Sequence, residues 1–129
     1  MPIEVSWGNP EKTVVYTALK EIWTLEDNHN MIDDMYKLTT SVTHTVHIVL
    51  DFTTSQSSPA KLLTSGNHIE KRKADNTGIS VIIKANGFVK AMAQLMMKMF
   101  LKDSKLFFAD TREEAFQIIE QYEQAHIPS

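Results

Sequence analysis

Apolar and polar residues alternate along the first part of the chain with the period of two that is typical of β-strands. In Ile3–Trp7 every second side chain is large and apolar, which predicts a short strand with one buried face. Gly8–Pro10 has strong turn chemistry, and Thr13–Ile22 follows it as a second strand. Two strands joined by a tight polar turn predict a β-hairpin at the start of the chain.

Three later runs also have the character of strands. Thr45–Phe52 is β-branched and almost continuously apolar, as expected of a central strand that is covered on both faces. Ile79–Ala85 follows the predicted turn Asp75–Gly78 and forms a second buried run, and Leu106–Ala109 forms a short last one. Thr53–Ser58 reads as a polar loop that leaves the central strand.

The segments between these runs have the periodicity of helices. A helix with Thr24 as its N-cap is expected to run to about Val42, with one apolar stripe along its length. Pro59–Lys73 and Phe88–Leu101 are expected to form two more helices, and Thr111–Glu114 matches a capping box that opens a last helix to about Gln124. The stripe of the first helix consists of Met31, Met35, Leu38 and Val42.

The predicted order of elements is β-β-α-β-α-β-α-β-α. Strands that alternate with helices favour a mostly parallel sheet, and the opening hairpin adds a mixed edge. The length of 129 residues fits one domain, with a core that we expect to span about residues 3–122. The fold class is therefore expected to be a single-domain α/β fold.

Composition narrows the possible partners and settings. The net charge is −3 with a pI near 5.9, and Lys71–Lys73 is a lone basic cluster, so nucleic acid is disfavoured as a partner. With no cysteine there is neither a disulfide nor a thiol nucleophile. The first residues lack the pattern of a signal peptide, and no apolar run reaches the ~18 residues of a membrane helix. We expect a cytoplasmic protein that does not bind membranes.

Three stretches carry a resemblance to a known family. Val46–Phe52 is similar to the central strand of STAS domains, the fold of bacterial anti-sigma factor antagonists. Gln56–Pro59 stands where the antagonists have an Asp-Ser-Ser-Gly run, with Gln56 in place of the acid. The stretch from Val89 through Phe107–Ile119 resembles their closing helix, strand and helix. The chain resembles most closely the small STAS-like proteins of bacteria. The resemblance implies a regulatory module, with Ser58 as the phosphorylated residue and an anti-sigma factor or related kinase-like regulator as the partner.

Two groups of polar residues are candidates for a site. The first is the segment after the central strand, which is expected to contact a partner or to be phosphorylated: Thr53, Thr54, Ser55, Ser57 and Ser58. The alternative for Ser58 is that it only caps the following helix, which contributes ~1 kcal/mol. The second is a polar cleft between Asp51 and Asn86 at the carboxyl ends of neighbouring strands. There the alternative is that loop amides simply satisfy the Asp51 carboxylate.

The helix predicted for Phe88–Leu101 is more apolar than packing on one sheet requires. Its polar residues Lys90, Gln94 and Lys98 form one narrow stripe, and the remainder is apolar or small. The excess favours a homodimer or partner interface, or one wall of an apolar ligand pocket. The alternative is that neighbouring elements of the same domain cover the helix. The expected interface residues are Met92, Met96, Met97 and Phe100.

No catalytic motif is present, so we expect a non-catalytic module without a cofactor. There is no nucleophile elbow, Walker loop or dinucleotide fingerprint, and His44 and His47 have a spacing that would not chelate one metal ion on a strand. An enzyme would have to bring together Asp51, Tyr36 and His47. The expected function is regulation through protein–protein interaction, and the alternative is binding of an apolar or amphiphilic small molecule.

Overall fold

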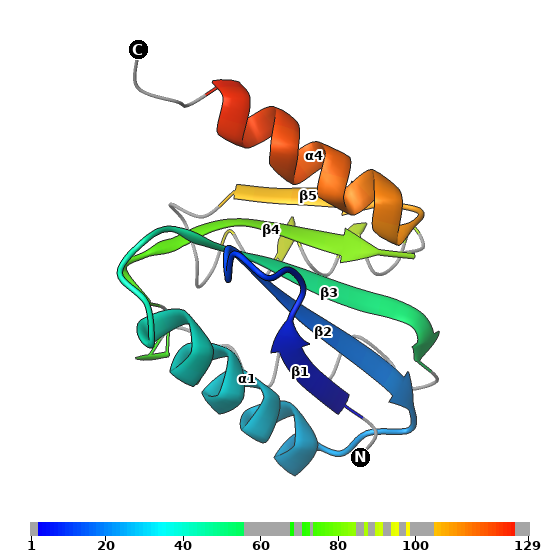
Figure 1. Cartoon of the computed structure of the whole chain (residues 1–129). Coiled ribbons are helices and arrows are strands. Elements are labelled where there is room, and N and C mark those ends of the chain that lie inside the picture. The colour runs from blue at the N-terminus through cyan, green and yellow to red at the C-terminus, as the bar shows by residue number, and fades with distance from the viewer. Residues whose placement is uncertain are drawn as a thin grey trace.

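The computed structural model describes residues 3–55, 68, 71–72, 74–84, 87, 90–91, 94–95, 98 and 105–125. Their order of strands and helices follows the predicted one (Figure 1). The bounds are β1 Ile3–Trp7, β2 Val14–Glu21, α1 Leu25–Thr40, β3 Val46–Ser55, β4 Thr77–Ile83, β5 Lys105–Ala109 and α4 Arg112–Ala125. The helix expected for residues 59–73 lies mostly outside the described residues.

The strands form one five-stranded sheet in the order β1-β2-β3-β4-β5. β1 and β2 are antiparallel, and the remaining neighbours are parallel. The predicted hairpin and mostly parallel sheet are therefore confirmed, and so is the α/β fold. β3 is the middle strand, as its continuous apolar run indicated.

The two long helices cover different parts of the sheet on opposite faces. α1 packs against β1 and β2, and α4 packs against β3, β4 and β5 (Figure 1). Because side chains alternate along a strand, Val49 faces α4 while Ile48 and Leu50 face the other side. The four residues of the predicted α1 stripe pack into the core, and so do Ala115, Ile118, Ile119 and Tyr122 of α4. No helix in the described part of the chain is long and apolar enough to cross a bilayer.

The end of β3 corrects one prediction. Thr53, Thr54 and Ser55 were expected to lie in a loop, but β3 continues through them to Ser55. β2 reaches as far and supplies hydrogen-bonding partners, since Lys20 pairs with Thr54 and Glu21 with Ser55. A polar residue at a sheet end stays extended when a neighbouring strand satisfies its backbone, which composition alone does not reveal.

The start of β4 corrects a second prediction. Thr77 and Gly78 were assigned to a turn, whereas the strand begins at Thr77 and ends at Ile83. Thr77 pairs with Val46, so β4 begins where β3 begins. Lys84 then has a positive φ of 65° and leaves the strand direction. The predicted strand was shifted toward the apolar residues, while the backbone pairing sets its actual ends.

Both helix starts use the capping residues that the sequence indicates. Thr24 accepts a hydrogen bond from the amide of Asp27, and the Asp27 carboxylate accepts one from the amide of Thr24. At α4, Thr111 accepts from the Glu114 amide at 3.1 Å, but the Glu114 carboxylate accepts from Asp110 rather than from Thr111. The predicted capping box of α4 is therefore only half formed.

A buried imidazole joins α4 to the sheet. His47 lies on the α4 side of β3 and is 2% exposed. Its Nδ1 accepts a hydrogen bond from the Ile79 amide at 3.0 Å, and its Nε2 lies 3.2 Å from the Glu123 carboxylate. The acceptor role of Nδ1 requires a neutral ring with its proton on Nε2. Burial lowers the pKa of His47 below 6.5, although the Glu123 carboxylate works in the opposite direction.

Gly78 makes room for this imidazole. A Cβ atom at position 78 would lie 2.3 Å from His47 Nδ1 and 2.9 Å from Thr45 Cγ2, which real Cβ atoms do not tolerate. The ladder between β3 and β4 is irregular at the same place, between Val46 and Ile48. The ring thus takes over a hydrogen bond that the β3 backbone does not make.

We expect Gly78→Ala to lower the free energy of unfolding by about 1–3 kcal/mol or more, because the methyl group must displace the imidazole or the strand. Gly87→Ala is the matched control: nothing lies within 4 Å of a Cβ there. Gly87 is helical and exposed, so an added methyl group meets no steric obstacle there. Urea unfolding of both variants measures the difference, and equal stabilities would contradict the packing argument.

We expect the folding stability of the chain to depend on pH through His47. Because the pKa of His47 is lowered in the folded state, the unfolded chain takes up a proton near pH 6.5 that the folded chain resists. Stability should therefore fall as the pH drops below about 6.5, with at most ~1.4 kcal/mol per pH unit from this residue. His47→Asn keeps an acceptor for the Ile79 amide and should have a shallower pH dependence. Urea unfolding at pH 7.5 and pH 5 compares the two, and parallel losses would rule out His47 as the cause.

Candidate functional site

On the α4 side of the sheet, α4 covers Val14 and Tyr16 in the first half of β2. Among the described residues, the row of side chains next to this contact is small or charged. Strand pairing places Glu4, Ala18 and Asp51 in one row across β1, β2 and β3. Glu4 is exposed, and Ala18 and Asp51 are half-buried. Glu4 is paired with Lys20 at 3.1 Å. Because Ala18 has only a methyl group, no bulky side chain separates the carboxylates of Glu4 and Asp51 in this row.

Asp51 is the centre of a hydrogen-bond network at the end of this row. Tyr16 donates its hydroxyl to one carboxylate oxygen of Asp51. The other oxygen accepts from the amide of Thr53 at 2.9 Å and from its hydroxyl at 2.5 Å. The carboxylate is therefore held by groups from two neighbouring strands and cannot rotate freely.

Arg112, the first residue of α4, packs on the face of the Tyr16 ring, whose hydroxyl group binds Asp51. Its guanidinium lies 4.4 Å from the centre of the Tyr16 ring and 5.3 Å from that of Phe116, within the range of cation–π attraction. The two rings are themselves parallel, with their centroids 6.4 Å apart. The start of α4 is thus fixed over the ring that holds Asp51.

The network shifts both titratable groups away from neutral pH. Burial, and after it the hydrogen bond to Asp51, raises the pKa of Tyr16 to about 12. Burial acts to raise the pKa of Asp51 too, but the hydrogen bonds from Thr53 and Tyr16 outweigh it and the pKa lies below 3.8. Neither group is poised to exchange a proton near pH 7, where general acid–base catalysis needs it. What the arrangement offers is a fixed carboxylate, two hydroxyls and a guanidinium for hydrogen bonding.

Two large apolar side chains are exposed at the same end of the sheet. Ile22, directly after β2, is 67% exposed, and Leu25, the first residue of α1, is 44% exposed. Between them Trp23 is fully buried, so the connection is anchored. Ile22 follows Glu21, which pairs with Ser55 at the end of β3. We call Ile22, Leu25, Tyr16, Asp51 and Thr53 the strand-end surface. Its polar residues lie on the α4 face of the sheet, whereas Leu25 begins α1, which covers the opposite face.

The structure brings together only part of the predicted site. Asp51 and Thr53 are in direct contact, and Thr54 is exposed beside them in β3. Ser55 ends the strand. The other predicted site residues lie outside the described residues: Ser57, Ser58, Asn86, Met92, Met96, Met97 and Phe100.

Two members of the network, Tyr16 and Arg112, were not found from the sequence. Alternation within β2 could have placed Tyr16 on the α4 side, but its contact with Asp51 depends on the pairing of β2 with β3. The candidates named for an enzyme do not gather. His47 lies at the other end of β3, and Tyr36 is exposed on α1.

The helix expected to be rich in methionine shows its polar side in the described residues. Lys90, Gln94 and Lys98 are helical and exposed, as the predicted polar stripe requires. Ala91 and Leu95 are exposed too, Leu95 by 44%. The exposed strip is therefore wider than the predicted one.

A smaller polar cluster lies on the outside of α1. Asp33 accepts from His68 at 2.8 Å and from Arg72 at 3.2 Å, and the hydrogen bond from His68 is the main reason that the pKa of Asp33 is lowered. His68 also stacks on His29, with centroids 4.5 Å apart. Arg72 belongs to the basic cluster Lys71–Lys73, so part of that charge is neutralised within the chain. Within the described ranges, no three side chains of His, Asp or Glu converge on a possible metal position.

Neither the protein-family models nor the curated proteins contain a match to this chain. The resemblance to STAS domains therefore stays a prediction from the sequence.

We expect Tyr16→Phe to lower the free energy of unfolding by about 1 kcal/mol at pH 7, since it removes a hydrogen bond to an ionised carboxylate at a half-exposed site. The same change should raise the pKa of Asp51, because one of the bonds that favour its charged form is lost. The stability cost should then shrink as the pH falls and the carboxyl of Asp51 is protonated.

Urea unfolding and an NMR titration of the Asp51 carboxyl carbon measure the two effects. Tyr36→Phe, at an exposed position of α1, is the control and should change neither. An unchanged midpoint for Asp51 in Tyr16→Phe would show that the hydroxyl does not stabilise the carboxylate.

Proposed function

We propose that this chain is a non-catalytic regulatory module of the STAS-like kind, which acts in the cytoplasm by binding a protein partner through the strand-end surface. The observation that carries the proposal is the combination of two exposed apolar side chains with an ordered polar network at one end of the sheet. This is also the end of β3 from which the chain continues toward Ser57 and Ser58.

The composition of the surface supports a protein partner. Apolar anchors surrounded by groups that hydrogen-bond are the usual anatomy of protein–protein interfaces. Ile22 and Leu25 supply the apolar anchors, and their neighbour Trp23 is buried, so little of the connection has to be ordered on binding. The fixed carboxylate of Asp51 adds an oriented acceptor for a donor on the partner.

Electrostatics gives the module a way to be switched. Asp51 is ionised at neutral pH, and Glu21 is exposed at the end of β2 beside Ser55. Phosphorylation of Ser58, three residues along the chain from the end of β3, would add close to two negative charges to an end of the sheet where Asp51 and Glu21 are at present balanced by Lys20, Lys84 and Arg112. An acidic partner surface would then be repelled and a basic one attracted, so phosphate on Ser58 changes affinity.

The test begins with the tagged chain recovered from its own cells, together with any protein bound to it and any phosphate on Ser57 or Ser58 identified by mass spectrometry. Calorimetry with the purified partner then compares variants. We expect Ile22→Asp to weaken binding at least tenfold, or about 1.4 kcal/mol, because it places a charge in an apolar contact. Ser58→Ala and Ser58→Asp should differ from each other in affinity.

Leu95→Asp is the matched control, since Leu95 is also exposed but lies on the helix predicted for Phe88–Leu101. If Leu95→Asp abolishes binding and Ile22→Asp does not, the partner binds that helix and the strand-end surface is not the site. If Ser58→Ala and Ser58→Asp both bind as the wild type does, there is no switch at Ser58.

A further inference from the structure

The last strand of the sheet has an outer edge that no described strand covers. β5 pairs with β4 over its whole length, and the sheet order ends with it. Figure 1 shows β5 along the border of the sheet farthest from the β1–β2 hairpin. An edge strand presents a row of backbone donors and acceptors that another strand can pair with.

The hydrogen bonds to β4 show which residues of β5 point outward. The carbonyl of Ala109 accepts from the amide of Lys84 at 3.0 Å, so the backbone groups of Ala109 point toward β4. Because backbone groups alternate along a strand, those of Phe107 and Lys105 also point inward. The amides and carbonyls of Leu106 and Phe108 therefore point outward from the sheet.

The side chains of β5 divide between the two faces. Leu106 and Phe108 pack into the core on the face opposite α4. Phe107 lies on the α4 side, where Ala109 joins the core beside α4, but Phe107 itself is 37% exposed. A large aromatic ring is thus left accessible at the middle of an open edge.

We propose that a second copy of this chain pairs antiparallel with the outer edge of β5, centred on Phe107, so that two five-stranded sheets become one. In this register Leu106 of one copy faces Phe108 of the other, and these are the residues whose backbone groups point outward. They exchange both hydrogen bonds of each pair. Phe107 faces Phe107 of the second copy as a non-hydrogen-bonded pair, in which side chains approach most closely.

The register is consistent with the faces of both sheets. In an antiparallel pair the residues directly opposite each other lie on the same face, and 106 with 108, and 107 with 107, satisfy this condition. The two exposed rings then cover each other on the α4 side. A shift by one residue would place Phe107 opposite a core residue of the other face.

Charge at the strand ends favours a second copy in the antiparallel direction. β5 begins with Lys105 and is followed directly by Asp110, and both are exposed. Antiparallel pairing brings the basic end of each strand beside the acidic end of the other. Parallel pairing of two copies would instead place like charges together, which is unfavourable.

This interface is separate from the strand-end surface. β5 and the β1–β2 hairpin lie at opposite edges of the sheet, and Ile22 follows β2 near the hairpin side. Each copy in the dimer therefore keeps its own strand-end surface free. Dimer formation and partner binding can be lost independently, so their tests do not depend on each other.

Light scattering of the whole chain tests the pairing, with Phe107→Lys as the disrupting variant. We expect a wild-type dimer and a folded Phe107→Lys monomer, because two lysines would face each other at the centre of the pair. Tyr36→Lys is the control and should stay dimeric, because Tyr36 is an exposed aromatic residue of α1, which packs against β1 and β2 at the other edge of the sheet. A monomeric wild type over a wide range of concentration overturns the proposal, and so does a Phe107→Lys variant that is still a dimer.

A second variant decides the case in which Phe107→Lys fails to fold. The chain has no cysteine, so Phe107→Cys introduces a single thiol. In the proposed register the two thiols are directly opposite, and mild oxidation should join nearly all the protein into a disulfide-linked dimer. Lys105→Cys, which faces Ala109 of the second copy, should crosslink far less. Equal crosslinking of the two variants, or none in Phe107→Cys, would refute the register.

Discussion

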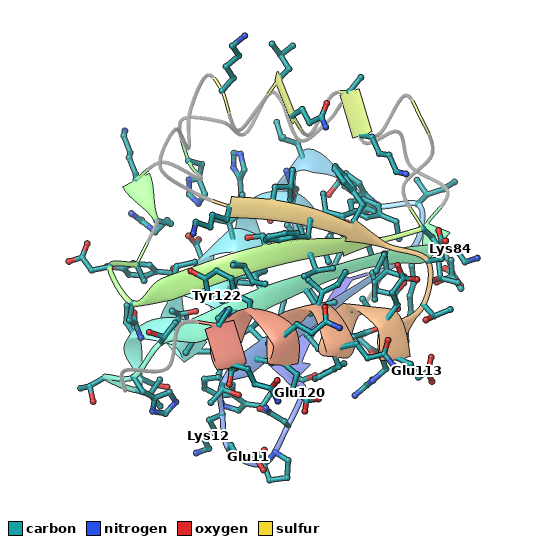
Figure 2. The ribbon with its side chains drawn as sticks, turned by 90° about the horizontal axis from the view of Figure 1, so that it is seen from above. Glu11, Lys12, Lys84, Glu113, Glu120 and Tyr122 are labelled. Atoms are coloured by element: carbon teal, nitrogen blue, oxygen red, sulfur yellow. The ribbon has the colours of Figure 1, made fainter. Side chains whose placement is uncertain are left out.

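The structure depends on three side chains of β3 that all face α4: His47, Val49 and Asp51. Alternation along the strand places them in one line, and each is fixed in a different way. Val49 is fully buried in the core. His47 binds the β4 backbone and reaches Glu123 near the end of α4, while Asp51 holds Tyr16, over which Arg112 at the start of α4 lies. Both ends of α4 are therefore tied to polar residues of the central strand, with apolar packing between them. In Figure 2, Tyr122 lies on the side of α4 that faces the sheet, and Glu113 and Glu120 lie on its outer side.

The two polar residues that hold α4 need different protonation states. His47 has to be neutral, because its Nδ1 accepts a hydrogen bond, whereas Asp51 has to be ionised, because it only accepts them. The shifts agree with these roles, since the pKa of each is lowered. Near neutral pH both requirements are met, so the sheet holds both ends of α4 there. Rigid hydrogen-bonding groups suit recognition of a partner better than proton transfer, which needs a group able to change its charge.

The order of elements could be predicted because each one has a local signal. Ile3–Trp7 alternates, α1 has its apolar stripe and Thr24 its cap, and all of these act over a few residues. The candidate site could be predicted only in part from such local signals. Asp51 and Thr53 were recognised because they are neighbours in the chain, but Tyr16 lies 35 residues before Asp51 and Arg112 much farther along it. Their meeting depends on which strands pair and on where α4 starts, and the extension of β3 to Ser55 depends in the same way on the length of β2.

The two edges of the sheet differ in a way that explains why only one would take up a second copy. The edge formed by β1 carries a charged residue on its open face, since Glu4 is exposed and paired with Lys20. If a second β1 strand paired there, the exposed Glu4 side chains of the two copies would lie close together. Edge strands commonly carry charged side chains, and these prevent such pairing. β5 has no charge between its ends, and it has an exposed aromatic ring at its centre. Its charges are at the two ends and of opposite sign, so they oppose parallel pairing and favour the antiparallel one.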